Sequence, residues 1–162
     1  MKNDLYSEIE KCSEEIEYIE VAISRLGPFD KSVFFLTNYA LIKAYGTIEF
    51  VFHSIVADYF NQSNLPQIHT YLENTVRTGS MSAQYGNMCR LLKQFDDDWA
   101  NNFKDAVNGH PDKEKILNSI QSLVTNRHSF AHGYPSSATF SDIQQYYLDA
   151  LLLISIFDSA IK

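Results

Sequence analysis

Cysteine and long apolar runs are scarce in this chain of 162 residues, and both shortages limit what it can be. Its two cysteines, Cys12 and Cys89, lie far apart and outside any CxxC or Cys/His spacing, which argues against a disulfide scaffold and a structural zinc site. No uninterrupted apolar run is long enough to span a membrane, and the Glu-rich start does not fit a signal peptide. We therefore expect a soluble, cytoplasmic protein that does not engage a membrane, with one domain over residues 1–162.

Positive charge is also scarce. The chain has 13 lysines and arginines against 20 acidic residues, for a net charge of −7. A broad nucleic-acid-binding surface usually needs a basic stripe, so this balance argues against one. A small anion site needs only local positive charge. The sequence leaves open whether the basic residues converge on such a site or are solvated separately; they include Arg77, Arg90, Lys93, Lys113, Lys115 and Arg127.

The residues that are present fit a well-packed helical protein. Apolar residues make up 45% of the chain and aromatic residues 14%, as in a globular fold. In the first 27 residues an apolar residue recurs at alternating steps of four and three, which predicts a long helix ended by Gly27 and Pro28. A second helix, capped by Asp30 or Ser32 and running to about Asn61, is apolar nearly all round. We expect it to be central or to lie at an oligomer interface.

Four further helical segments are expected. They lie around residues 68–76 and 87–95, from Asp112 to the segment that holds Arg127, and from Ser141 or Asp142 to the C-terminus. The three aspartates at 96–98 cap or interrupt the helix before them, and residues 108–111 form a loop. No stretch alternates apolar and polar residues as a half-buried strand does. We therefore predict an all-α fold, a single up-and-down bundle of four to six helices.

Residues 127–133, RHSFAHG, form the most informative segment. Arginine holds a phosphate in a fork of hydrogen bonds, and histidine exchanges a proton near neutral pH, so Arg127 and His132 suit phosphoryl chemistry. On an ideal helix a five-residue step separates them by about 140°, which would not aim both at one phosphate. A dimer interface, or unwinding toward Gly133, would relieve this. The spacing therefore favours a composite site.

His128 precedes His132 by four residues, which places both on one helical face and also suggests a metal-binding pair. No adjacent carboxylate completes such a site and HExxH is absent, so we expect neither a metal nor another cofactor.

Tyr45, Glu49 and His53 follow one another at four-residue steps on the apolar second helix. A buried carboxylate needs a partner. Glu49 either orients Arg127 or a catalytic histidine, or it belongs to a structural hydrogen-bond network that pins the second helix to the fourth. The two interpretations are compatible.

Three motifs in register resemble the HEPN superfamily, small helical-bundle proteins whose signature is an arginine and a histidine with four to six residues between them. Residues 123–133, LVTNRHSFAHG, resemble the Leu-Val-x-x-Arg-Asn-x-apolar-Ala-His-Gly pattern of many members. Residues 44–50, AYGTIEF, resemble the Tyr-x-x-x-Glu segment of the second helix. Residues 82–95 resemble the Asn…Arg-Leu-Leu…Phe segment of stand-alone bacterial members of the RiboL-PSP-like branch.

This resemblance implies a metal-independent endoribonuclease that acts on RNA as a homodimer, and many such proteins are toxins of toxin–antitoxin or phage-defence systems. By position, His132 would act as general base or acid and Arg127 would neutralise the phosphate in the transition state, supported by Glu49 and Tyr45. One departure is His128, where active relatives often have asparagine. A histidine there can donate a hydrogen bond or complete an acid–base pair, or it can mark altered chemistry or a lost nuclease.

Tyr134 ends the same motif. His132-Gly133-Tyr134 resembles the His-x-Tyr ending of HEPN toxins whose partner nucleotidyltransferase attaches AMP to the tyrosine. The alternative is a turn tyrosine that packs before Pro135.

Three functions are therefore compatible with the sequence. The first is a homodimeric RNase toxin or defence effector with an antitoxin or a nucleotidyltransferase as partner. The second is a catalytically inactive HEPN module that binds RNA, a nucleotide or a protein, which the acidic charge and His128 favour. The third is a helical interaction protein in which Arg127 and His132 are structural.

Overall fold

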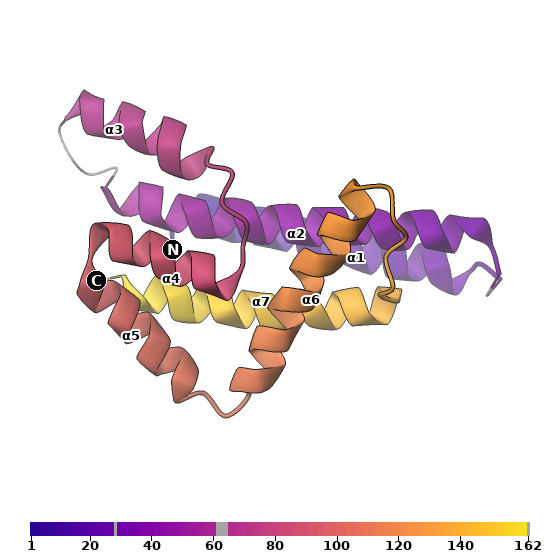
Figure 1. The fold of residues 1–162 in the computed structure, drawn as a ribbon. Helices are drawn as coiled ribbons and strands as arrows, with labels where there is room; N and C mark the ends of the chain where they lie inside the picture. The colour runs from indigo at the N-terminus through magenta and orange to yellow at the C-terminus, as the bar shows by residue number, and fades with distance from the viewer. Residues whose placement is uncertain (28, 61–64, 162) are drawn as a thin grey trace.

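The computed structural model describes residues 1–27, 29–60 and 65–161, and this part of the chain contains helices and no strand (Figure 1). The all-α prediction is confirmed. The described residues form seven α-helices, one more than the upper end of the predicted range, and a short π-helical turn, η1 (Glu73–Arg77), continues α3. The α-helices are α1 (Asn3–Ser24), α2 (Lys31–Phe60), α3 (Pro66–Leu72), α4 (Tyr85–Phe95), α5 (Asp97–Asn108), α6 (Lys113–Ala131) and α7 (Phe140–Ala160). Two residues predicted at helix ends, Pro28 and Asn61, lie outside the described residues.

The additional helix is α5. Its N-cap is Asp96, whose Oδ1 accepts hydrogen bonds from the backbone N–H groups of Asp98, at 2.7 Å, and Trp99, at 3.1 Å. The aspartate run predicted to cap or interrupt the preceding helix therefore starts a new one, as expected of an aspartate at an N-cap. Trp99, Phe103 and Val107 then bury one face of α5 at four-residue steps.

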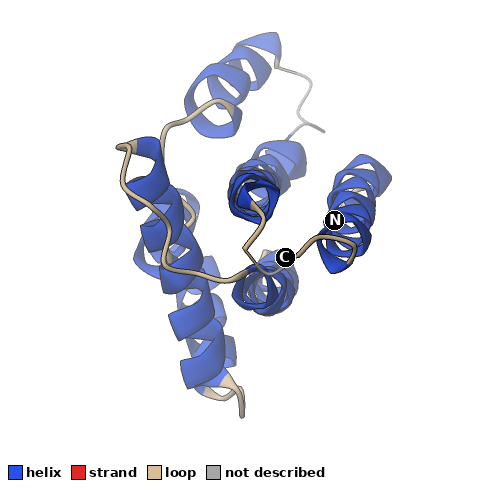
Figure 2. Cartoon of the chain, turned by 90° about the vertical axis from the view of Figure 1, so that its right-hand side faces the viewer, coloured by secondary structure: helices blue, strands red, loops and turns tan. Residues whose placement is uncertain are grey.

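Helix α2 is the centre of the fold. It lies beside α1 and α7, and Figure 2 shows these three long helices nearly end-on, while α6 crosses them at a steep angle in Figure 1. Its buried residues include Leu41, Ile48, Val51 and Phe52. By length and composition α2 could cross a membrane, since its most apolar stretch has a mean hydropathy of 1.3, but 67% of that stretch is buried inside the protein. This burial is what the core helix of a globular bundle shows.

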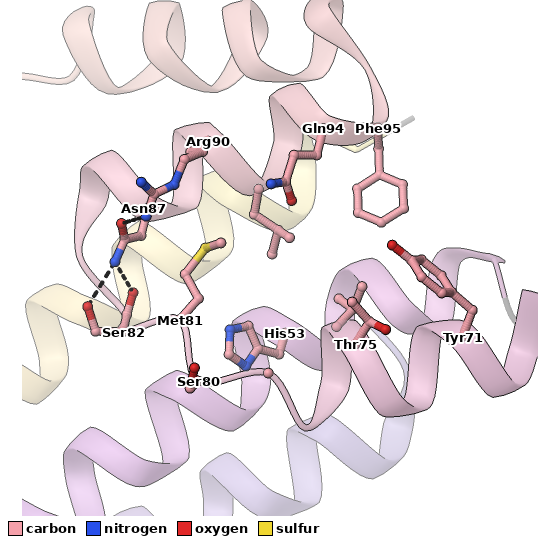
Figure 3. Close-up of a pocket in the computed structure, with 13 residues that line it drawn as sticks. His53, Tyr71, Thr75, Ser80, Met81, Ser82, Asn87, Arg90, Gln94 and Phe95 are labelled. Atoms are coloured by element: carbon pink, nitrogen blue, oxygen red, sulfur yellow. Dashed lines mark hydrogen bonds between the residues drawn. The ribbon is translucent and has the colours of Figure 1, made fainter.

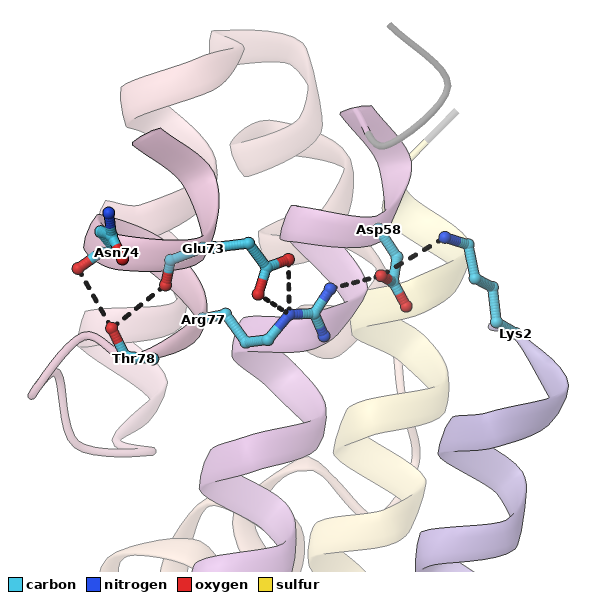
Figure 4. Close-up of polar contacts among 6 residues, drawn as sticks. All are labelled: Lys2, Asp58, Glu73, Asn74, Arg77 and Thr78. Carbon is cyan, nitrogen blue, oxygen red and sulfur yellow. Dashed lines mark hydrogen bonds and ion pairs between the residues drawn. The ribbon is translucent and has the colours of Figure 1, made fainter. Parts of the chain in front are cut away.

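An ion-pair network ties η1 to the end of α2 (Figure 4). Arg77 Nε lies 2.9 Å from both carboxylate oxygens of Glu73, and the Arg77 guanidinium also donates to Asp58. Lys2 Nζ reaches the same Asp58 carboxylate at 3.3 Å. The network fixes the segment that leads from α3 to α4, although this segment is short and irregular.

Helix α6 ends in a Schellman motif one residue after His132. Gly133 has a φ of +82°, and its N–H donates to the Phe130 carbonyl while the Tyr134 N–H donates to the Ser129 carbonyl. These bonds turn the chain sharply away from the helix. The helix thus stays wound up to His132 and is not opened toward Gly133.

Candidate active site

Arg127, the positively charged residue of the predicted Arg127/His132 pair, packs against α2. The Arg127 guanidinium carbon stands 4.8 Å from the centroid of the Tyr45 ring, within the range of a cation–π interaction. Arg127 is half-buried and Tyr45 is buried. Among the described residues, no carboxylate lies within ion-pair distance of Arg127. Its charge is therefore held by an aromatic face and is not neutralised by the fold.

Glu49 is joined to this arrangement through Tyr45. The Tyr45 hydroxyl donates to Glu49 Oε1 at 2.7 Å. Burial raises the pKa of Tyr45, and the bond to Glu49 raises it further, so the phenol stays protonated. Glu49 consequently fixes the ring on which Arg127 rests and does not contact the guanidinium itself.

A cavity of about 270 Å³ opens beside Arg127. His128 and Ser129 line it from α6, Tyr45 from α2, and Ser82 and Gln84 from the segment before α4. None of the described residues that line it is acidic, although the chain carries 20 acidic residues. An anion entering the cavity meets Arg127 without a competing carboxylate.

The two histidines lie at the exposed end of α6. The His128 and His132 rings contact each other, with centroids 4.4 Å apart and an interplanar angle of 61°. His128 lines the Arg127 cavity, whereas His132 is not among the described lining residues. No group of three histidine, cysteine or acidic side chains in the described chain is placed to hold a metal ion, so the two imidazoles stand as a pair.

The loop after the site is anchored by Asn126. Its Oδ1 accepts bonds from the backbone N–H groups of Ser137, at 3.1 Å, and Ala138, at 3.3 Å, and from the hydroxyl of Ser136, at 3.0 Å. Residues 133–135 therefore form a loop that projects away from the helix. At its apex Tyr134 is 67% exposed, so the phenol does not pack as a turn tyrosine buried before Pro135.

From the sequence we assign no role to Ser82, Gln84 or Asn126, although all three lie in segments that carry the family resemblance. Asn126 directly precedes Arg127, and a buried asparagine at the end of a helix often binds a returning loop, which was a usable signal. Ser82 and Gln84 carry no comparable signal, since only the tertiary fold brings residues 82–84 to α6. His53, placed on the Tyr45 and Glu49 face by its spacing, is buried and opens onto a different cavity.

Comparison with known protein families identifies a relationship for this chain. Residues 7–162 match the model of the RiboL-PSP-HEPN family, and no match was found among curated proteins or solved structures. HEPN domains are RNase-like or nucleotide-binding modules that are often RNases, commonly dimerise and bind RNA. The match covers most of α1, all of α2 to α7 and the segment around Arg127, and the chain belongs to the RiboL-PSP-HEPN family of the HEPN superfamily.

Proposed function

We propose that this protein is a metal-independent endoribonuclease that works as a homodimer. The observation that carries the proposal is the acid-free cavity lined by both Arg127 and His128, with His132 in ring contact with His128. An uncompensated guanidinium beside two imidazoles supplies a phosphate-binding cation and two proton-transfer groups within one small region.

The proposed reaction is a transesterification within the RNA strand. One imidazole accepts the proton of a 2′-hydroxyl, and the 2′-oxygen attacks the adjacent phosphorus. The bond from phosphorus to the 5′-oxygen breaks, and a second imidazole in its protonated form gives that oxygen a proton. Arg127 stabilises the negative charge that builds on the phosphate oxygens. The products are a 2′,3′-cyclic phosphate and a 5′-hydroxyl.

His128 gains a role from this geometry. Where active relatives often have asparagine, it lines the cavity beside Arg127 and touches His132. We assign His128 and His132 to the two proton transfers. In this assignment His128 takes part in proton transfer, at the position where active relatives often have asparagine.

A second protomer completes the site. Within one chain His128 lines the Arg127 cavity and His132 does not, so a partner's His132 would supply the second imidazole that faces the phosphate. Helix α2 also leaves large apolar side chains exposed along its length, which suits a helix at an oligomer interface. They include Phe34, Phe35, Tyr39, Ile42 and Phe50.

The biological setting forms part of the same proposal. A cytoplasmic RNase of this family would act as a toxin or a phage-defence effector, restrained by an antitoxin. The exposed Tyr134 also suits modification by a partner nucleotidyltransferase, because its phenol stands clear of the fold close to His132.

A second function is favoured by the charge. With a net charge of −7 and histidine at position 128, a catalytically inactive module that binds RNA, a nucleotide or a protein partner would use the same Arg127 cavity. Saturable binding without strand cleavage would identify it.

The deciding experiment is cleavage of RNA in EDTA by the purified protein beside His132→Ala, His128→Ala and Arg127→Ala. All forms must remain folded by circular dichroism and must keep the same oligomeric state by light scattering. We expect EDTA-resistant cleavage with cyclic-phosphate ends that the His132 and Arg127 changes abolish. Cleavage that persists in every variant would reveal a contaminant, and no cleavage by any form would support the binding module.

A further inference from the structure

A second cavity lies beside the one at Arg127 and is almost three times as large, at about 790 Å³ (Figure 3). It is enclosed by α2, α3, η1, α4 and the loop between η1 and α4. Its described lining includes His53, Tyr71, Ser80, Asn87, Arg90 and Gln94. Ser82 lines this cavity and the Arg127 cavity, so the two share a wall. Its volume lies in the range of sites that hold a small organic ligand.

The electrostatics of the large cavity suit part of an anionic ligand. Its described lining holds the cation of Arg90 and no carboxylate, as the Arg127 cavity holds Arg127 and no carboxylate. The chain has 20 acidic residues, and none of them is among the described residues that line these two adjoining cavities, which suits an approaching phosphodiester strand.

His53 and Gln94 supply directional hydrogen bonding. Only 2% of His53 is exposed, yet its ring points into the cavity in Figure 3. Burial lowers the pKa of His53, and a bond to the backbone of Met81 opposes that shift, so the ring is neutral at pH 7. A neutral ring that donates to Met81 keeps its second nitrogen as an acceptor. The Gln94 amide adds a donor and an acceptor, which is the chemistry that reads a base edge.

Aromatic side chains supply a stacking surface. Tyr71 and Phe95 lie together at one end of the cavity in Figure 3, and Tyr71 is 61% exposed. Phe95 is fixed by stacking on Phe60, with ring centroids 5.1 Å apart. An exposed tyrosine beside an anchored phenylalanine offers a π-face to any base, whatever its identity.

Side-chain bonds hold the shared wall in place. Asn87 Nδ2 donates to the Ser82 hydroxyl at 2.8 Å and to the Ser82 carbonyl at 3.0 Å. The Arg90 guanidinium donates in turn to Asn87 Oδ1. A strand that crosses Ser82 would therefore meet a fixed edge between the two cavities.

We propose that the large cavity binds one unpaired base of the RNA strand whose phosphate lies at Arg127. The inference rests on the proposed function for the placement of the phosphate, and it names the substrate class: RNA that is single-stranded near the cleaved bond. A paired base cannot enter, because its edge and faces are already occupied in the duplex. A free nucleotide carries the same base, and we favour the strand because the cavity adjoins the Arg127 site at Ser82.

The first test measures binding of labelled single-stranded oligoribonucleotides to the His132→Ala protein by fluorescence anisotropy. Adding Tyr71→Ala or Gln94→Ala should raise the Kd at least tenfold, and Ser80→Trp, which fills the cavity, should do the same. Tyr18→Ala and Ser155→Trp are matched controls, since both residues are exposed and neither lines either cavity. Unchanged Kd values in all three cavity variants, each folded by circular dichroism, would overturn the proposal.

The second test separates this inference from the proposed nuclease. In the protein with its histidines intact, sequencing of cleavage ends should show that Gln94→Ala flattens the base preference near the cut while cleavage continues. If the protein does not cleave RNA but its binding still depends on Tyr71 and Gln94, the nuclease fails and the base pocket stands. Cleavage with an unaltered preference would leave the nuclease and refute the pocket. Cavity-dependent binding of a mononucleotide, with none for the oligomers, would refute the strand as ligand.

Discussion

Arg77 and Arg127 are both partly buried arginines, and the fold treats them in opposite ways. Arg77 forms ion pairs with two carboxylates, Glu73 and Asp58, and these pairs hold η1 to α2 (Figure 4). Arg127 rests on the Tyr45 ring, and the described residues offer it no ion pair. A guanidinium without a carboxylate keeps its capacity to hold a phosphate.

The difference shows how a functional cation can be recognised in an acidic protein. Net charge is a poor guide, because most basic side chains here are paired or solvated. The informative feature is a partly buried cation whose neighbours have been kept free of acid, as around the Arg127 cavity. The following predictions test that contrast, from the largest expected effect to the smallest.

Removing the free arginine should separate activity from stability most clearly. We expect Arg127→Ala to lower kcat/KM for RNA by about a thousandfold, or about 4 kcal/mol of transition-state stabilisation. The free energy of unfolding should fall by only about 0.5–1 kcal/mol, the size of one partly exposed cation–π contact. Arg127→Lys keeps the positive charge but loses the forked hydrogen bonds, so its kcat/KM should lie between those of the unchanged protein and Arg127→Ala. Single-turnover cleavage and urea unfolding measure the two quantities, and a large loss of stability would make Arg127 a structural residue.

Removing the paired arginine should have the opposite result. Arg77→Ala removes the partner that Asp58 and Glu73 share, and Asp58, the more buried of the two, keeps only its ion pair with Lys2. Breaking such a pair costs about 3–5 kcal/mol when it is fully buried, so we expect about 1–3 kcal/mol at this partly exposed site. Urea unfolding measures the loss. Cleavage by the fraction that stays folded should change by less than about threefold, and a larger drop would mean that the network also shapes the site.

Giving Arg127 a carboxylate should make it resemble Arg77. Gln84 lines the Arg127 cavity, and Gln84→Glu changes charge with almost no change in shape. We expect cleavage to fall by about tenfold, or about 1.4 kcal/mol, because the new carboxylate competes with the phosphate. Gln121→Glu, on the exposed part of α6, is the matched control. If Gln84→Glu leaves cleavage unchanged in low salt, the absence of acid around Arg127 has no functional meaning.

The smallest effect concerns His53, a buried histidine whose ring is neutral at pH 7. Because burial lowers the pKa of His53 below its ordinary value of 6.5, the unfolded chain binds a proton that the folded protein does not. Its contribution to stability is full above pH 6.5 and is lost as the pH falls through the folded-state pKa. Between pH 7 and pH 6 we expect a loss of at most about 0.7 kcal/mol. Comparison of urea unfolding at the two pH values for the protein and His53→Gln should show a smaller dependence in the variant.

Much of the fold follows from local pattern, and the site follows only in part. The alternating apolar stripe predicts α1. The second helix is apolar on nearly every face, which predicts that α2 is central, because a helix without a polar face must be buried. Helix α5 is missing from the prediction, although Trp99, Phe103 and Val107 recur at four-residue steps, because the aspartate run at 96–98 is interpreted there as the end of the preceding helix. Arg127 and His128 could be found from their motif. The contribution of Ser82 and Gln84 to the cavity could not be predicted, since it depends on how the segment before α4 packs against α6.

The length of α2 has a consequence for how RNA would be read. Tyr45, under Arg127, and His53, in the large cavity, are borne by the same unbroken helix. Eight residues of α-helix rise about 12 Å, and a helix packed on both sides resists stretching. The helix thus holds the parts of the two cavities that Tyr45 and His53 line at a fixed separation. In a nuclease built this way, the number of nucleotides between the recognised base and the cut bond would be constant, whatever the sequence between them.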